Sequence, residues 1–408
     1  MTTLLRSATL ADGSIVDVVI DDGRITEVAR AFSVAGAEVI HDLCGYVLLP
    51  APAEPHAHLD KALTADVVAN PRGDLMGAIE SWQAHRAGLS ASDIAARARR
   101  AARLAVANGV TALRTHVDVG ADIELAAVEA LLDVRREMTG LLDLQIVALV
   151  GRPTSGLEGA DNRARLRAAL DAGVDIGGGC PHVDPDPKAC LDACFEIAGE
   201  FDRPIDLHMD ENLDPESLDV RYMAEVVQSS GWERGAVASH CVSLGVQPLA
   251  VQERIAEEIA EAGVGVVTLP QTNLFLQGRD HPTSTPRGLT AIRPLLDAGV
   301  TLGAGGDNLQ DPFNTVGRGD PLETAALLVM AGHLTPEEAY RAVSVDARQA
   351  MGLEAPEITA GAPAELLAVH AATLREAVAC APASRMVLHR GEIVAQTSVR
   401  SEIITPTV

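Results

Sequence analysis

Eight mostly apolar segments, separated by alanine-rich stretches, constrain the fold of this chain more than any other feature of its sequence. Each segment ends in polar residues, which is typical of a buried parallel strand. The stretches 91–108, 124–138 and 249–262 between them have the spacing of amphipathic helices. Eight consecutive strand–helix units predict an α/β fold, a closed (β/α)8 TIM-like barrel. The expected strands cover residues 46–58, 110–119, 142–150, 174–182, 204–211, 236–241, 264–271 and 300–307.

The two ends of the chain differ from this centre. Short alternating segments at 14–21 and 24–28 surround a turn, and 364–370 and 385–395 repeat the pattern. We therefore predict that both termini together build one small β-sandwich domain beside the barrel. The expected boundaries are 1–50 plus 355–408 for the small composite domain, and 51–354 for the barrel.

Composition narrows the class of partner. Aromatic residues make up only 2% of the chain against 47% hydrophobic residues, so we expect an aliphatic core. The formal net charge of -25 disfavours nucleic acid and anionic membranes as partners, which leaves a small-molecule substrate. We find no apolar run of about 18 residues, no secretion signal, and six cysteines without a CxxC pair. These features predict a cytoplasmic protein with reduced thiols.

Histidine and acidic residues gather where the expected strands end, which is the catalytic face of a barrel enzyme. The first strand ends in His56-Ala57-His58, and period-two alternation places both imidazoles on one side. His208 at the fifth strand and Asp307 at the eighth can complete a site for one divalent ion, Zn²⁺ or Fe²⁺, with a position open for water. Polar tips at a barrel rim are the alternative, which suits one isolated histidine better than this ordered set.

Two further residues lie where they can take part in the chemistry. Glu211, three residues after His208, can act as a general acid/base toward the water, although it could also be an ordinary loop carboxylate. His240 at the sixth strand can orient the attacking hydroxide or ligate a second metal. The chain has only two lysines, Lys61 and Lys188, and neither lies on the fourth strand to bridge two ions, so we expect a single metal.

These residues together resemble the amidohydrolase superfamily, in the branch of bacterial cytosine deaminase and the aminohydrolase that acts on N-isopropylammelide. The resemblance covers nearly the whole chain, and the order and spacing of its motifs are specific. It implies that His56, His58, His208 and Asp307 hold one iron or zinc ion. It further implies that Glu211 shuttles the proton, while His240 and Asp307 orient the hydroxide, in subunits that form homo-oligomers. The motifs are EPHAHLD at 54–60, RTHVD at 114–118, LDLQIVA at 142–148, HMDE at 208–211, ASH at 238–240, LQGR at 276–279, DN at 307–308 and DP at 311–312.

The substrate contacts are expected to differ from those of cytosine deaminase. Gly151-Arg152 stands where that enzyme has a glutamine, Asn308 replaces an aspartate and Phe313 a tryptophan. Arg152 can pair with a carbonyl-rich or acidic ring. Lys61 can contact substrate or form a rim salt bridge with Asp60 or another acid. The predicted substrate contacts are Lys61, Arg152, His182, Asn308 and Phe313.

The sequence thus predicts a hydrolytic deaminase of a small nitrogen heterocycle, cytosine-like or a pterin, purine, triazine or creatinine-like ring. One alternative is a hydrolase of an exocyclic N-alkyl amine or a ring C–N bond in the same site. The other is a barrel that binds metal without turnover, and the presence of Glu211 beside the metal motif argues against it.

Overall fold

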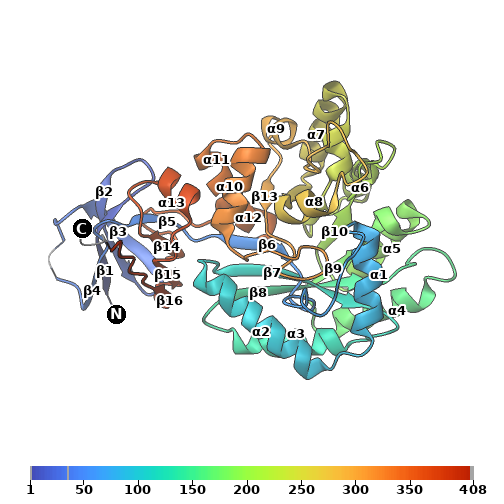
Figure 1. Ribbon diagram of the computed structural model, residues 1–408, viewed down its shortest axis with the longest axis horizontal. Coiled ribbons are helices and arrows are strands. Elements are labelled where there is room, and N and C mark those ends of the chain that lie inside the picture. Colours follow the sequence, from blue (N-terminus) through green and yellow to red (C-terminus); the bar gives the residue numbers. More distant parts are fainter. Residues whose placement is uncertain (1, 35, 405–408) are drawn as a thin grey trace.

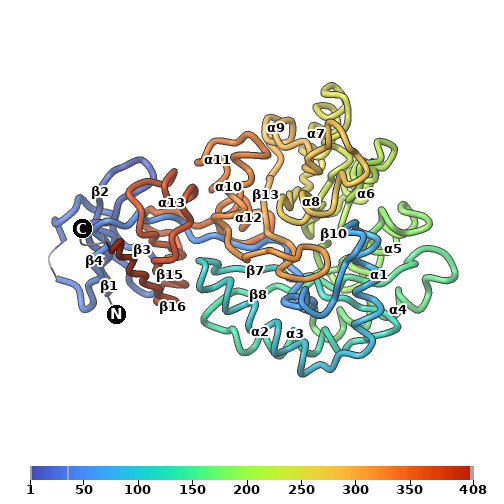
Figure 2. The backbone as a smooth tube through the Cα atoms, viewed as in Figure 1, coloured from blue at the N-terminus to red at the C-terminus, as the bar shows by residue number. Residues whose placement is uncertain are grey.

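A computed structural model describes residues 2–34 and 36–404 of the chain. A small sheet holds both chain ends on one side of the molecule, and a larger barrel surrounded by helices forms the other side (Figure 1). The tube in Figure 2 shows the chain leaving the small sheet for the barrel and returning to it after the last helices of the barrel.

The barrel is a sheet of eight parallel strands whose spatial order is their sequence order. Its two end strands approach each other, and an isolated parallel bridge between Ala57 and Asp307 joins them. The predicted barrel is therefore confirmed, in a nearly closed form. Its strands are β6 (Ala53–Ala57), β7 (Ala112–Val119), β8 (Asp143–Val150), β9 (Ile176–Gly179), β10 (Ile205–Met209), β11 (Ala236–His240), β12 (Gly265–Thr268) and β13 (Leu302–Ala304).

Helices cover the outside of the barrel, and local sequence fixes where they begin. Ser90, for example, accepts a hydrogen bond from the backbone of Asp93 at the start of its helix, and Thr335 and Glu338 form a capping box. The helices are α1 (Leu75–Arg86), α2 (Ala91–Ala107), α3 (Ala126–Glu137), α4 (Ala160–Asp171), α5 (Pro187–Glu200), α6 (Asp219–Ser230), α7 (Leu249–Ala262), α8 (Pro270–Leu276), α9 (Ile292–Asp297), α10 (Pro321–Ala331), α11 (Pro336–Ala342), α12 (Val345–Ala350) and α13 (Leu374–Cys380), with 3₁₀ turns η1 (Pro181–Val183) and η2 (Val242–Val246).

Both chain ends build the small domain, as predicted, and hydrogen bonds join its strands into one mixed sheet. The N-terminal β5 pairs with the C-terminal β14, so the two ends of the chain are interleaved. The boundaries 1–50 plus 355–408 and 51–354 stay a prediction. The strands are β1 (Thr3–Thr9), β2 (Ile15–Asp21), β3 (Arg24–Arg30), β4 (Val39–Asp42), β5 (Val47–Pro50), β14 (Leu366–Val369), β15 (Arg385–His389) and β16 (Glu392–Thr397).

The expected first barrel strand, 46–58, is two strands in the structure. Residues 47–50 form β5 of the small sheet, and residues 53–57 form β6 of the barrel. Pro52 lies between them and has no backbone N–H to donate to a strand ladder, so the chain changes sheets there. One apolar run thus connects the two domains.

The core is aliphatic, as the composition predicts. The largest buried cluster joins barrel strands to surrounding helices through Ala, Val, Leu and Ile, with Phe195 and Tyr340 as its aromatic members. Among the described residues, no helix combines the length and apolar character needed to cross a membrane.

Candidate metal centre and pocket

Three imidazole nitrogens and one carboxylate oxygen converge at the C-terminal end of the barrel. The Nε2 atom of His208 lies 3.2 Å from Nε2 of His56 and 3.3 Å from Nε2 of His58. Asp307 Oδ1 lies 3.3 Å from Nε2 of His58 and 3.6 Å from Nε2 of His56. The structure therefore brings together the four residues predicted as ligands, from β6 and the residue that follows it, from the end of β10 and from the segment after β13.

These residues fit a divalent ion by spacing and by charge. Tetrahedral zinc with bonds of about 2.0–2.1 Å separates its ligand atoms by roughly 3.3–3.4 Å, close to the distances here. Burial and the neighbouring imidazoles hold the pKa values of His56 and His208 well below the ordinary range, so both rings are neutral, as metal ligation requires. Within the described residues, the buried Oδ1 of Asp307 has no hydrogen-bond donor. A cation would satisfy this oxygen.

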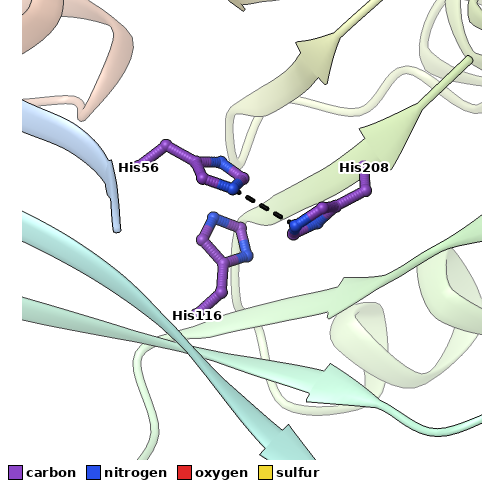
Figure 3. Close-up of side chains that lie close together, drawn as sticks. All are labelled: His56, His116 and His208. Carbon is purple, nitrogen blue, oxygen red and sulfur yellow. Dashed lines mark hydrogen bonds between the residues drawn. The ribbon is translucent and has the colours of Figure 1, made fainter. Parts of the chain in front are cut away.

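A fourth histidine, His116 from β7, belongs to the same cluster, and sequence reasoning gave it no role. Its ring stacks on that of His56 with 3.9 Å between centroids, and His56, His116 and His208 also form a possible ligand group (Figure 3). Neither ring nitrogen of His116 has a hydrogen-bond partner in the described part of the chain. The alternation of Arg114, His116 and Asp118 on one strand face was the signal that could have placed this ring inside the barrel.

Backbone strain marks the strand ends that carry the site. Asp210, His240 and Asp307 have φ values of 51°, 73° and 62°, a region that non-glycine residues seldom adopt. Such conformations cost of order 1–3 kcal/mol each and cluster at functional sites. The surrounding barrel therefore imposes the positions of His240 and Asp307.

Glu211 lies between two histidines at the floor of the pocket. Its carboxylate oxygens are 3.6 Å from Nδ1 of His240 and 3.9 Å from Nε2 of His182. Burial, followed by the charge of Asp307, raises the pKa of Glu211 well above its ordinary value, and Lys61 acts against this rise. A carboxyl group with a raised pKa binds a proton more readily than an ordinary carboxylate, as a general acid/base does.

His182 and His240 are held by different partners. His182 Nδ1 lies 3.0 Å from the carbonyl oxygen of His208, which leaves its Nε2 facing Glu211. His182 lies in η1, and α5 begins shortly after this turn, at Pro187. His240 Nδ1 contacts the amide oxygen of Asn273 at 3.1 Å.

Lys61 is buried at the pocket wall and is already paired. Its Nζ atom lies 3.1 Å from Asp118 Oδ1, 3.1 Å from His58 Nδ1 and 4.0 Å from Asp60 Oδ1. Asp118 also accepts hydrogen bonds from Trp82 Nε1 and Arg86 Nη1, each at 2.6 Å. Of the two interpretations of Lys61, the structure shows the salt bridge, made chiefly with Asp118.

The other expected substrate contacts line the same pocket, but their amide and guanidinium groups differ in availability. The Asn308 amide donates to Asp311 at 2.8 Å and contacts Thr272, so it is largely engaged within the protein. Arg152 is half-buried and makes no hydrogen bond or ion pair within the described residues. The ring of Phe313 lies 5.5 Å from Lys61 Nζ and forms an apolar part of the wall.

Comparisons with known proteins find similar proteins that hydrolyse nitrogen heterocycles. A model of the amidohydrolase family matches residues 67–395. The chain is 32% identical to a pterin deaminase of Rhizobium rhizogenes over 384 residues, which are 93% of this chain and 87% of the relative. The structure of 5-methylcytosine deaminase from Klebsiella pneumoniae, liganded with 5-fluorocytosine, superposes with a TM-score of 0.89 at 29% identity, and 99% of each chain is covered. N-isopropylammelide isopropylaminohydrolase from Burkholderia multivorans gives a TM-score of 0.83 at 29% identity, covering 97% of this chain and 98% of that chain.

Proposed function

Because the chain belongs to the amidohydrolase family, we propose that it is a metal-dependent hydrolase that deaminates a small nitrogen heterocycle. The observation that carries the proposal is the convergence of the three imidazoles and the Asp307 carboxylate beside the buried carboxyl group of Glu211, at the floor of one pocket. The substrate is a ring whose C=N carbon bears an amino group, and water replaces that group as ammonia is released.

His56, His58, His208 and Asp307 would hold one divalent ion, zinc or iron. When bound, such an ion acts as a Lewis acid and makes hydroxide available at neutral pH. All four residues are at most 6% exposed, so bulk water does not compete for their lone pairs.

Glu211 is the proton carrier in this proposal. It takes a proton from the attacking water and delivers it to the ring nitrogen, and in a second transfer it takes the remaining proton of the added hydroxyl and gives it to the departing amine. His240 stands on the other side of the Glu211 carboxylate and its Nε2 is without a partner among the described residues, so it can hydrogen-bond the attacking oxygen. In the overall reaction, water and the aminated ring give a ring carbonyl and ammonia.

The charged lining of the pocket selects among ring substrates. Lys61 and Asn308 are engaged within the protein, whereas the guanidinium N–H groups of Arg152 at the wall have no partner in the part of the chain that the structure describes. A ring with a carbonyl or carboxylate opposite the scissile amine would satisfy them. The similarity to a pterin deaminase and to a 5-methylcytosine deaminase supports a ring of this type, an aminated pyrimidinone or a fused pterin.

Hydrolysis of an exocyclic N-alkyl amine is the second candidate. The similarity to N-isopropylammelide isopropylaminohydrolase supports it, because the same attack on a ring carbon then releases an alkylamine in place of ammonia. The two candidates share the metal residues and differ in the leaving group.

The test measures the released amine with purified, metal-analysed protein against aminopyrimidinones, pterins, purines, aminotriazines, N-alkylated aminotriazines and cyclic guanidines. We expect ammonia from one ring class, lost on chelation. Glu211→Gln should lower turnover by about 10²–10⁴-fold with unchanged metal content. Glu216→Gln, an exposed glutamate on the same loop, is the matched control and should retain activity.

Two other outcomes would count against this first candidate. Release of an alkylamine from an N-alkylated ring, without ammonia from any unalkylated ring, would favour the second candidate. No amine from any ring, by protein holding one metal per chain, would contradict both.

A further inference from the structure

Behind His56, on the side away from the pocket, a chain of hydrogen bonds runs through the barrel interior. His56 Nδ1 lies 2.9 Å from Ser239 Oγ, and Ser239 Oγ donates to Asp206 Oδ1 at 2.9 Å. Arg114 Nη1 donates to the other oxygen, Asp206 Oδ2, at 2.7 Å. These four residues come from four different strands and are at most 4% exposed.

The chemistry of these groups fixes which atom donates and which accepts in each of these hydrogen bonds. A guanidinium only donates, and a carboxylate only accepts. The hydroxyl hydrogen of Ser239 is therefore committed to Asp206, and the hydroxyl oxygen must accept the remaining hydrogen bond. That hydrogen bond comes from Nδ1–H of His56, so the neutral ring keeps its lone pair on Nε2, the nitrogen that faces His208 and Asp307.

Arg114, at the far end of this series of hydrogen bonds, is itself anchored to the backbone through Gln145. Arg114 Nε donates to Gln145 Oε1 at 3.0 Å, and Gln145 Nε2 donates to the carbonyl oxygen of Met351 at 3.1 Å. The oxygen and the nitrogen of the Gln145 amide are thereby both fixed, and the guanidinium cannot turn away from Asp206 without breaking a second hydrogen bond.

The other two imidazoles of the centre lack such an arrangement. The Nδ1 atom of His58 faces the Lys61 ammonium, and Nδ1 of His208 has no hydrogen-bond partner within residues 2–34 and 36–404. A hydrogen-bonded carboxylate behind a ligating histidine fixes its tautomer and orientation, and the removal of such a partner typically weakens metal affinity 10–100-fold.

We propose that Ser239 and Asp206, held in place by Arg114, are positioning residues that fix the His56 tautomer needed to bind the metal. This inference rests on His56 being a metal ligand in the proposed function. The serine hydroxyl relays the constraint from the carboxylate to the ring, and neither residue contacts the substrate pocket.

The first experiment measures the zinc affinity of the full chain by competition with a chromophoric chelator. Ser239→Ala should weaken zinc binding about 10–100-fold. Ser344→Ala is the matched control, because Ser344 is a similarly buried serine whose hydroxyl donates to the Tyr340 carbonyl and takes no part in the hydrogen bonds behind His56. It should bind zinc like the wild type. Ser239→Thr retains the hydroxyl and should restore most of the affinity.

His56→Ala separates this inference from the proposed metal site. If His56→Ala binds zinc as tightly as the wild type, the metal site itself is wrong. If His56→Ala loses zinc while Ser239→Ala keeps wild-type affinity, the metal site stands and the positioning role is overturned.

The second experiment detects the tautomer directly, by ¹⁵N NMR of histidine-labelled, metal-free protein. The wild type should show His56 protonated at Nδ1. In Asp206→Asn the amide can donate to Ser239, which lets the hydroxyl donate to the ring and moves the proton to Nε2. An unchanged His56 tautomer in Asp206→Asn would overturn the proposal even if zinc affinity fell, because a loss of packing alone leaves the tautomer as it was.

Discussion

Asp118 should be a large single contributor to the stability of the pocket wall. Its carboxylate accepts three hydrogen bonds, from Lys61 at 3.1 Å and from Trp82 and Arg86 at 2.6 Å. Burial by itself would raise the pKa of Asp118, but Lys61 and Arg86 hold it below the ordinary range, so the group is ionised in the folded chain. Asp118→Asn replaces this anion with an amide of the same shape.

The magnitude follows from what the substitution leaves behind. Arg86 keeps its second partner, Asp122, with contacts of 2.6 and 2.8 Å, but Lys61 is left without any carboxylate of the described residues within 3.5 Å. Leaving one charge of a buried pair without its partner costs about 3–5 kcal/mol. We therefore expect Asp118→Asn to lower the free energy of unfolding by that amount, measured by urea denaturation with chelator present in every sample.

A double-mutant cycle with Lys61→Met tests whether the unpaired Lys61 ammonium causes this loss of stability. Methionine keeps the length of the side chain without its charge, so in the double variant no ammonium is left unpaired. The double variant should be more stable than Asp118→Asn alone, with a coupling energy of about 1–3 kcal/mol. Asp133→Asn, which removes an exposed partner of Arg136, is the control and should change stability by less than about 1 kcal/mol. Additive effects of Asp118→Asn and Lys61→Met would refute the reasoning.

Three further predictions concern other parts of the chain. Arg152→Gln should raise KM for a ring bearing a carboxylate more than for its uncharged analogue, with kcat little changed, and equal effects on both would exclude Arg152 as the anion partner. The Arg293 hydrogen bond lowers the pKa of Glu338 to about 2, so its stabilisation is present above pH about 4.5 and is lost as the pH falls toward 2. Because Glu338 is partly exposed, we expect the free energy of unfolding to fall by less than about 1 kcal/mol over this pH range. Acid unfolding should show this decrease in the wild type and not in Glu338→Gln. In Gly245→Ala the added Cβ would overlap the carbonyl oxygen of Leu289, so the free energy of unfolding measured with urea should fall by about 1–3 kcal/mol. An unchanged urea midpoint would mean that the loop moves aside without cost.

The sequence predicted the parts of the structure that depend on periodicity. Alternation on a strand places His56 and His58 on one side, and the order of strands in a barrel brings His208 and Asp307 to them. The Ala57–Asp307 bridge shows why this works, since closure of the barrel places the last strand end beside the first.

The parts that sequence reasoning missed depend on how side chains from different strands meet. Ser239 and Asp206 look like ordinary polar residues inside apolar runs, and only the register of β10 and β11 brings them together behind His56. The expected strand 46–58 failed for a related reason, because hydrophobicity alone does not say that Val47–Pro50 pairs with a strand from the other end of the chain. Asn308 lines the pocket and its amide nitrogen donates to Asp311, a contact that the sequence does not reveal, so its contact with substrate stays a prediction.

The most direct test of the central claim is the anomalous scattering of crystals of the zinc-loaded protein, recorded on both sides of the zinc absorption edge. We expect one anomalous peak per chain, within bonding distance of Nε2 of His56, His58 and His208 and of a carboxylate oxygen of Asp307. The absence of a peak among these four atoms in zinc-saturated protein, or a single peak elsewhere, would contradict it.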